Sequence, residues 1–201
     1  MSDTTVIAYP TDDIDLLIII ASTRPGRVGL PVGTWITGVA EAHGGFRVRV
    51  ADLATINLPF MNEPQHPVNK QYMFDHTKQW SAIVEPADAY LFVMPEYNNS
   101  MNAPLKNALD YLSLEWGYKP VCFVSYGGVS GGLRAVQQVK QTVAALKMTA
   151  VAEAVTIPSV AKFVHDSLFA PEPRVETAAN TMLGQLRRWA IALKPMRTGE
   201  I

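Results

Sequence analysis

The sequence predicts an α/β protein, in which five parallel strands form a sheet with helices on both faces. Short, continuous aliphatic runs recur along the chain, as in strands that are buried on both sides. Segments with apolar residues at helical spacing alternate with these runs. Because right-handed crossovers place such helices on either side of a parallel sheet, the alternation predicts three layers, α/β/α.

Five segments have the composition of strands. Asp15–Ala21 is a continuous aliphatic run that stops at the turn-forming sequence STRPGR, and Phe46–Leu53 alternates in the manner of an outer strand. Ala87–Met94 is a second fully apolar run. The fourth and fifth strands are expected at Lys119–Tyr126 and Met148–Ile157.

Helices are expected between these strands and after the last one. Gly29–His43 has helical spacing of apolar residues, and Gly44-Gly45 supplies a stop signal. The stretch from Ala54 to Lys70 contains three prolines and three asparagines, which predicts a long loop without regular structure. The other helices are predicted at about residues 71–86, at Ala103–Trp116, at Leu133–Leu146 and at about Arg174–Ala192.

Length and composition indicate one domain. A chain of 201 residues with 48% hydrophobic content closes one sizeable core, so residues 14–195 are expected to form a single domain after a flexible tail at residues 1–13. The 17 Lys and Arg against 18 Asp and Glu give no broad charged surface for a nucleic acid or a membrane. The N-terminus lacks the pattern of a secretory signal and no apolar run is long enough to span a bilayer, so a cytoplasmic location is expected.

The loops that follow the first, third and fourth strands carry the functional prediction. In an open parallel sheet ligands bind beyond the carboxyl ends of the strands, where the winding direction reverses. The flavodoxin-like strand order 2-1-3-4-5 puts that point between strands one and three. The first loop, Ser22–Gly29, leads hydroxyls, arginines and glycines into a helix N-terminus, which favours a phosphate, although a solvated turn has the same composition. It lacks both the Walker and the G-x-G-x-x-G patterns.

The other two loops are suited to a flat ligand. Pro95–Ser100 follows the third strand, and Ser125–Gly132 has four glycines in eight residues, which lets a planar ring approach the backbone closely. Taken alone the second of these is typical of an ordinary glycine-rich turn. Together, at one edge of the sheet, the two loops predict a slot whose main-chain groups face the polar edge of a heterocycle.

Four motifs resemble the NADPH-dependent FMN reductase family, which includes azoreductase-like, quinone and chromate reductases. They are STRPGR, DLATINLPFMNEPQHP, ADAYLFVMPEYNNSMNAPLKNALDYLSLEW and SYGGVSGG, and they lie between Leu16 and Ile157. The resemblance implies a flavodoxin-like fold, FMN as the cofactor and NADPH or NADH as the electron donor.

The resemblance also implies which residues hold the flavin. Where many relatives have a second serine or an asparagine, this chain has Val28-Gly29, so main-chain amides and Arg27 are expected to substitute. The predicted FMN contacts are, for the phosphate, Ser22, Arg24, Arg27, Val28 and Gly29; for the isoalloxazine edge, Pro95, Glu96, Tyr97 and Asn98; and for its other rim, Ser125, Tyr126, Gly127 and Gly128.

The activity implied by the resemblance is hydride transfer from the nicotinamide to the flavin. Ping-pong transfer to a small acceptor follows, such as a quinone, an azo compound, a free flavin or an oxidised metal ion. Because the cofactor supplies the chemistry, no catalytic side chain is required, and the backbone of Glu96 is expected to matter more than its carboxylate. The alternatives are a one-electron carrier, against which the balanced charge argues, and a flavin-binding redox sensor without turnover.

Several reactive side chains have simpler interpretations. Cys122, the single cysteine, excludes a disulfide framework and a cysteine-based metal site within one chain, and its apolar surroundings predict a buried small hydrophobe. The four histidines lack metal-ligand spacing, so no metal is expected. Lys106 and Asp110 have the spacing of a helical ion pair. The aromatic stretch Asp110–Tyr118 fits either the core or a subunit interface, and with the family resemblance it predicts a homo-oligomer, a dimer or a tetramer.

Overall fold

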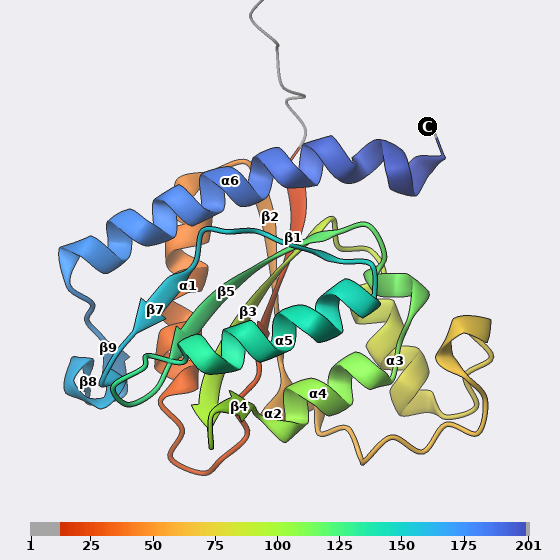
Figure 1. Ribbon diagram of the computed structural model, residues 1–201, viewed down its shortest axis with the longest axis horizontal. Coiled ribbons are helices and arrows are strands. Elements are labelled where there is room, and N and C mark those ends of the chain that lie inside the picture. The colour runs from red at the N-terminus through yellow and green to blue at the C-terminus, as the bar shows by residue number, and fades with distance from the viewer. Residues whose placement is uncertain (1–12, 200–201) are drawn as a thin grey trace, which may run out of the picture.

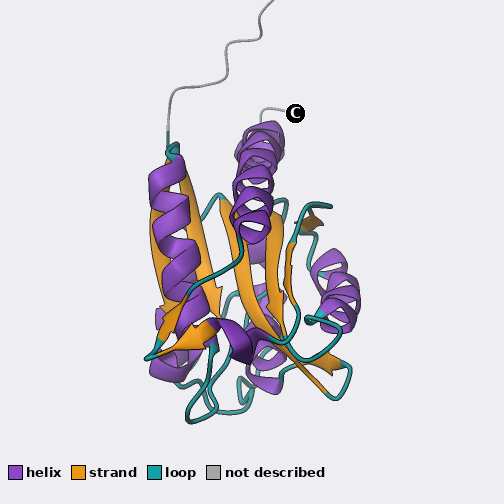
Figure 2. Cartoon of the chain, turned by 90° about the vertical axis from the view of Figure 1, so that its left-hand side faces the viewer, coloured by secondary structure: helices purple, strands orange, loops and turns teal. Residues whose placement is uncertain are grey.

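The computed structural model describes residues 13–199 (Figure 1). Of the predicted tail at residues 1–13, all but Asp13 lies outside the described residues. Within the described part a central sheet lies between two layers of helices (Figure 2). The predicted α/β/α arrangement is therefore confirmed.

The sheet has the predicted strand order. Parallel pairing runs β2-β1-β3-β5-β6, with β7 also paired to β5. The fifth predicted strand is thus present in two short pieces, and the order corresponds to 2-1-3-4-5. The strands are β1 Ile14–Ile20, β2 Phe46–Asp52, β3 Ala89–Tyr97, β5 Pro120–Tyr126, β6 Thr149–Ala150 and β7 Val155–Ile157.

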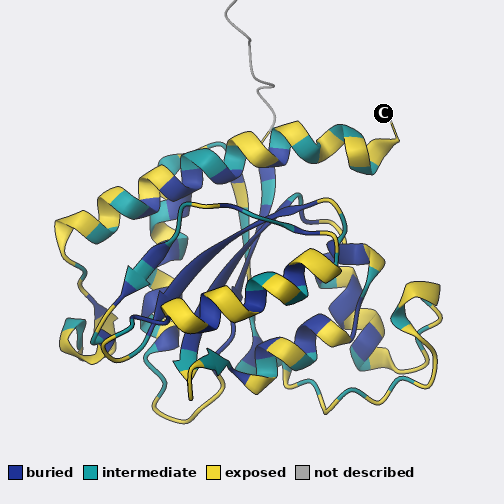
Figure 3. Ribbon diagram, viewed as in Figure 1, coloured by how far each residue is buried: buried dark blue, intermediate teal, exposed yellow. Residues whose placement is uncertain are grey.

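Five long helices cover the sheet. α1 (Gly29–His43) and α6 (Pro173–Thr198) pack on one face, where they share a core with Ile18, Leu91 and Val124. The opposite face is covered by three helices, α3 Asp75–Val84, α4 Ala103–Asp110 and α5 Leu133–Ala145. In Figure 3 the inner strands β1, β3 and β5 are buried along most of their length.

The structure corrects several predicted boundaries. α3 begins at Asp75 rather than at about residue 71, β3 continues past Met94 to Tyr97, and α6 continues past Ala192 to Thr198. The helix predicted at Ala103–Trp116 ends at Asp110, and a separate 3₁₀ turn, η2, covers Leu114–Trp116. The long loop after β2 contains a short helix, α2 (Leu53–Ile56), because the Asp52 carboxylate caps it by accepting from the N–H of Ala54 at 3.0 Å.

Five small elements have no counterpart in the sequence predictions. Three of them are strands of short antiparallel hairpins at the carboxyl end of the sheet, where tight turns rather than long patterns determine the structure. They are the 3₁₀ turns η1 Pro67–Asn69 and η3 Val160–Phe163, the strand β4 Ser100–Met101, and the hairpin of β8 Val164–His165 with β9 Leu168–Phe169.

Two interpretations of isolated reactive residues are confirmed, those of Cys122 and of the Lys106–Asp110 pair. Cys122 is buried in β5, and burial raises the pKa of its thiol. Lys106 Nζ donates to the Asp110 carboxylate at 2.6 Å along α4. Among the described residues no group of histidine, cysteine and acidic side chains could hold a metal ion, and no helix is long and apolar enough to cross a membrane.

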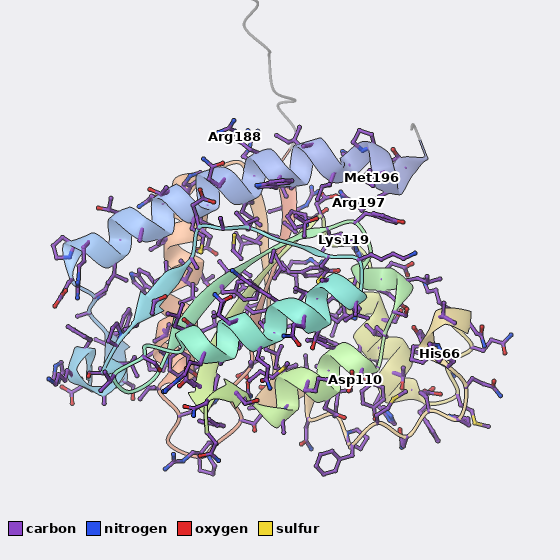
Figure 4. The ribbon with its side chains drawn as sticks, viewed as in Figure 1. His66, Asp110, Lys119, Arg188, Met196 and Arg197 are labelled. Carbon is purple, nitrogen blue, oxygen red and sulfur yellow. The ribbon has the colours of Figure 1, made fainter. Side chains whose placement is uncertain are left out.

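A buried lysine lies at the amino end of β5, the end farthest from the functional loops. Lys119 Nζ donates to the carbonyl of Glu85 at 2.8 Å and to the hydroxyl of Tyr90 at 3.1 Å. Figure 4 labels it close to Arg197 of α6. Burial, reinforced by the positive charge of Arg197, lowers the pKa of Lys119 to about 8.

This pKa shift predicts a stability that rises with pH. Between pH 8 and 10 the unfolded chain, with an ordinary lysine pKa, binds more protons at this position than the folded protein does. From pH 7.5 to 9.5 the free energy of unfolding of the native protein should therefore gain about 1–2 kcal/mol relative to Lys119→Met. Urea titrations of both proteins across this range measure the difference, and parallel pH profiles would contradict it.

Candidate functional site

The three predicted loops meet around one cavity of about 320 Å³, called here the flavin cavity. Eight of its ten lining residues were predicted from the sequence as flavin contacts. The other two are Gly26 and Val160. The lining consists of Arg24, Gly26, Arg27 and Val28 after β1, Pro95, Glu96 and Tyr97 at the end of β3, Tyr126 and Gly127 at the end of β5, and Val160.

The first loop offers its positive groups to the cavity. Arg24 is exposed, and its side chain makes no hydrogen bond or ion pair with any described residue. α1 begins after Val28 with neither a capping side chain nor an acidic residue in its first turn. An uncapped helix N-terminus beside a free guanidinium attracts an anion of the size of a phosphate.

Two hydroxyls and a glycine form the floor beneath this loop. Ser22 and Tyr126 are buried, and their hydroxyl oxygens have no hydrogen-bond partner among the described residues apart from each other. Burial raises the pKa of Tyr126, partly offset by Ser22 and Arg27, so the phenol stays neutral near pH 7. A Cβ on Gly29 would overlap both hydroxyl oxygens. Only glycine therefore fits at the first position of α1.

Arg27 has a different environment from Arg24. Its guanidinium donates to the Asp52 carboxylate at the end of β2 and, at 2.6 Å, to the main-chain carbonyl of Ser22. The Asp52 hydrogen bond raises the pKa of Arg27. Since the same carboxylate caps α2, this pair ties the first loop to the end of β2. The predicted contact of Arg27 with a phosphate stays a prediction.

The loop after β3 is a tight hairpin. β3 and β4 pair at Tyr97 and Ser100, and the two residues between them, Asn98 and Asn99, both have left-handed φ angles, of 50° and 64°. Such a type I′ turn favours asparagine, which explains the Asn-Asn sequence. Pro95 and Tyr97 line the flavin cavity, Pro95 as a buried residue and Tyr97 as an exposed one, whereas Asn98 is exposed and does not line it.

The Glu96 carboxylate has a structural role. It accepts hydrogen bonds from Arg134 Nε at 2.7 Å, from Ser130 Oγ at 2.9 Å and from the N–H of Arg134 at 3.1 Å. Burial disfavours the charged form, but these hydrogen bonds outweigh it and lower the pKa of Glu96. The carboxylate thus caps the N-terminus of α5, and the expected role of the Glu96 backbone stays a prediction.

The glycine-rich loop is held from two sides. The buried Ser125 hydroxyl donates to the carbonyl of Gly131 at 3.0 Å. The carbonyls of Gly127 and Gly128 accept from the N–H groups of Val160 and Ser159, at 3.3 and 2.8 Å. These hydrogen bonds fix the path of the loop at the mouth of the flavin cavity.

Sequence reasoning missed three residues that shape the site. Asp52 and Val160 come from other parts of the chain, and no local pattern marks them. Asn102, at the start of α4, is buried, and its side-chain amide donates to the carbonyl of Ala21 at 2.6 Å, while its side-chain oxygen Oδ1 has no partner among the described residues. Its place directly after the PEYN hairpin is the one signal that could have identified it.

Two further cavities surround the first loop. One, of about 410 Å³, shares Arg24, Gly26 and Arg27 with the flavin cavity and also contacts Ser167 of the β8–β9 hairpin. The other, of about 450 Å³, lies between α2 and α4 and shares Thr23 with the first of these two. The loop Thr23–Arg27 is therefore bordered by cavities on several sides.

The chain matches known proteins over most of this architecture. The family model of NADPH-dependent FMN reductases matches residues 14–162. The NAD(P)H-dependent FMN reductase ntnL of a Nectria species is 36% identical over 153 residues, covering 73% of this chain and 76% of that protein. The NAD(P)H-dependent FMN reductase C4B3.06c of Schizosaccharomyces pombe is 37% identical over 135 residues, covering 66% and 67%.

Solved structures agree on the fold. The flavoenzyme NAD(P)H:(acceptor) oxidoreductase FerB of Paracoccus denitrificans superimposes with a TM-score of 0.69 at 19% identity, covering 88% of this chain and 97% of that one. The matched residues contain all three loops of the flavin cavity, and in sequence and architecture the chain belongs to the NADPH-dependent FMN reductase family, whose members are oxidoreductases that use FMN and NAD(P)H.

Proposed function

We propose that the chain holds FMN in the flavin cavity and passes electrons from NAD(P)H to a small acceptor such as a quinone or an azo compound. The observation that carries this proposal is the convergence of eight predicted contacts from three loops on one cavity. The expected site residues are the thirteen named from the sequence, with Arg24 as the principal phosphate ligand.

The residues present fit FMN. A phosphate would find the free guanidinium of Arg24 and the uncapped start of α1, above the two buried hydroxyls of Ser22 and Tyr126. The ring would find the exposed Tyr97-Asn98 turn on one side and the Gly127-Gly128 backbone on the other. The absence of side chains at Gly127 and Gly128 would let the ring approach the backbone closely, and the main-chain groups of the Tyr97-Asn98 turn would suit the alternating donors and acceptors of the pyrimidine edge.

The protein's contribution is to bind and orient. FMN, when bound, supplies the chemistry of accepting and releasing a hydride. The hairpin at Asn98 and the Glu96 carboxylate fix the two loops relative to each other, so the geometry is set before a ligand arrives. No described acid or base in the flavin cavity has to move a proton for this reaction.

Alternation of donor and acceptor is a direct test of the function. If the sheet edge and its three loops cover one side of the ring, nicotinamide and acceptor must use the other side in turn. Initial rates with NADPH at several fixed quinone concentrations should therefore give parallel double-reciprocal lines. The protein should also release FMN on heating, identified by its mass.

Two results would count against the proposed function. Intersecting lines mean that donor and acceptor bind at the same time. This result excludes the proposal that they use the same face of the flavin in turn. Recovery of FAD, or no flavin binding at all, excludes the assignment of the flavin cavity. A long-lived semiquinone without quinone turnover favours the electron carrier that the sequence left as an alternative.

We also propose a homo-oligomer and a cytoplasmic location. Tyr111, Leu112 and Trp116 are buried in the chain's own core, so within Asp110–Tyr118 the large apolar side chains left for an interface are Leu114, 53% exposed, and Tyr118, 38% exposed. Light scattering at micromolar concentration should give at least the mass of a dimer. A mass of one chain alone would contradict the proposal.

A further inference from the structure

The cavity between α2 and α4, called here the second cavity, lies beside the flavin cavity without being part of it. In Figure 1 the loop after β1, α2 and the start of α4 gather along the same edge of the molecule. The volume of about 450 Å³ is within the range of small-molecule sites. It is lined by Thr23, Leu53, Ala54, Asn57, Leu58, Pro59, Phe60, Ala103, Pro104 and Asn107.

The lining carries no charged side chain. Seven of the ten residues are apolar, and the three polar ones, Thr23, Asn57 and Asn107, are neutral. Burying a charge without a partner is strongly unfavourable, so a phosphate, a sulfonate or a metal oxyanion finds no counter-charge here. A flat, neutral organic ring loses little hydration free energy on entering the cavity, and it gains contact with the apolar walls.

The outer wall of the second cavity is fixed in place. Asn107 of α4 accepts from the N–H of Met61 at 2.9 Å and donates to the carbonyl of Pro59 at 2.7 Å. The Tyr111 hydroxyl lies 3.2 Å from the carbonyl oxygens of both Pro59 and Phe60. The Phe60 ring, 83% exposed, stands at this wall without being packed into the core.

The second cavity is linked to the flavin cavity along the first loop. Thr23 lines both the second cavity and the cavity of about 410 Å³, and Arg24, Gly26 and Arg27 line both that cavity and the flavin cavity. An acceptor whose reacting end lies at the flavin would therefore extend along this loop to reach the second cavity.

We infer that the second cavity is a subsite for the neutral, apolar body of the electron acceptor, and that it selects flat uncharged acceptors over anionic ones. This inference rests on the proposed function. The electron donor does not suit the subsite, because the two phosphates of a nicotinamide dinucleotide need cations and none lines it.

A variant that fills the second cavity provides the test. Ala103 lines it at the exposed first position of α4, so Ala103→Phe adds bulk inside the cavity without disturbing the core. Ala82→Phe, on the exposed face of α3, is the matched control. FMN-loaded full-length proteins are assayed at saturating NADPH with 2-methyl-1,4-naphthoquinone, with its sulfonate, and with ferricyanide, which needs no ring subsite.

The expected result is specific to the neutral quinone. Ala103→Phe should raise its KM by about tenfold or more, the scale of losing a few methylene contacts in an apolar pocket. Phe60→Ala, which removes an exposed ring and leaves the core intact, should raise the same KM about fivefold. Ferricyanide turnover should not change in either variant, Ala82→Phe should match the native protein, and the native protein should prefer the neutral quinone to its sulfonate.

Other outcomes overturn the inference in distinguishable ways. If both variants reduce the naphthoquinone as the native protein does, or the native protein prefers the sulfonate, the subsite is wrong while the proposed function stands. If ferricyanide turnover falls as much as naphthoquinone turnover, the variants act on the flavin and the subsite is again wrong. If the native protein oxidises NADPH with none of the three acceptors, the proposed function fails and the subsite with it.

Discussion

Gly29→Ala is expected to abolish flavin retention and to lower the melting temperature by about 2–12 °C. The added methyl group would overlap the hydroxyl oxygens of Ser22 and Tyr126. Ser22, just after β1, and Tyr126, at the end of β5, are both buried, so their hydroxyls have little room to move aside except toward the first loop. Overpacking of this kind costs about 1–3 kcal/mol. The displaced hydroxyls would enter the space proposed for the phosphate.

Gly38→Ala in the same helix is the matched control. Gly38 is exposed, has an ordinary helical backbone, and a Cβ there would meet no atom within 4 Å. This substitution should stabilise the protein by about 0.5–1 kcal/mol, since alanine favours the helix over glycine. Thermal melts and the flavin absorbance of the purified proteins check both variants. Full flavin content in Gly29→Ala would refute the proposal that the phosphate lies above Ser22, Tyr126 and Gly29.

Arg24→Ala is expected to weaken FMN binding by about 1.5–3 kcal/mol, or roughly 10- to 150-fold, the scale of a hydrogen bond to a charged group. The melting temperature of the flavin-free protein should stay the same, because the Arg24 side chain contacts no described residue through a hydrogen bond or ion pair. Riboflavin lacks the phosphate, so its affinity should not change. Fluorescence titrations with both flavins give the two dissociation constants.

Arg27→Gln separates a phosphate contact from a structural one. Because Arg27 is paired with Asp52 and with the Ser22 carbonyl, its loss should loosen the whole loop and weaken FMN and riboflavin alike. A loss confined to FMN would instead show that Arg27 contacts the phosphate. Should Arg24→Ala weaken riboflavin as much as FMN, the phosphate assignment of Arg24 is wrong.

The elements that the sequence predicted best are those whose pattern is long. β1, β3 and β5 are buried on both faces along most of their length, so most of their positions are apolar and the continuous runs identify them clearly. The break between β6 and β7 could not be read, because an edge strand needs no continuous pairing. The end of α4 at Asp110 was missed because Tyr111, Leu112 and Trp116 stay apolar after the helix stops, being buried in the same core.

For the candidate site, sequence identified the loops but not their internal contacts. Arg24 and Arg27 belong to one motif, and the sequence alone gives no reason to distinguish them. Their difference depends on Asp52, which lies 25 residues away and reaches Arg27 because β1 and β2 are neighbours. The structural role of the Glu96 carboxylate likewise depends on Arg134. Arg134 lies near it because α5 packs beside β4.

By itself, the sequence determined the alternation of strands and helices, the family and the three loops of the site, since each depends on local pattern or on motifs of adjacent residues. The strand order was predicted from the flavodoxin-like fold. Only the tertiary structure decided which arginine is free, why Gly29 must be glycine, and that an uncharged second cavity lies beside the loop. Those properties depend on contacts between residues distant in sequence, such as Ser22 with Tyr126 and Pro59 with Asn107. Chain pattern alone does not specify such contacts, because they form when the sheet brings separate loops to one edge.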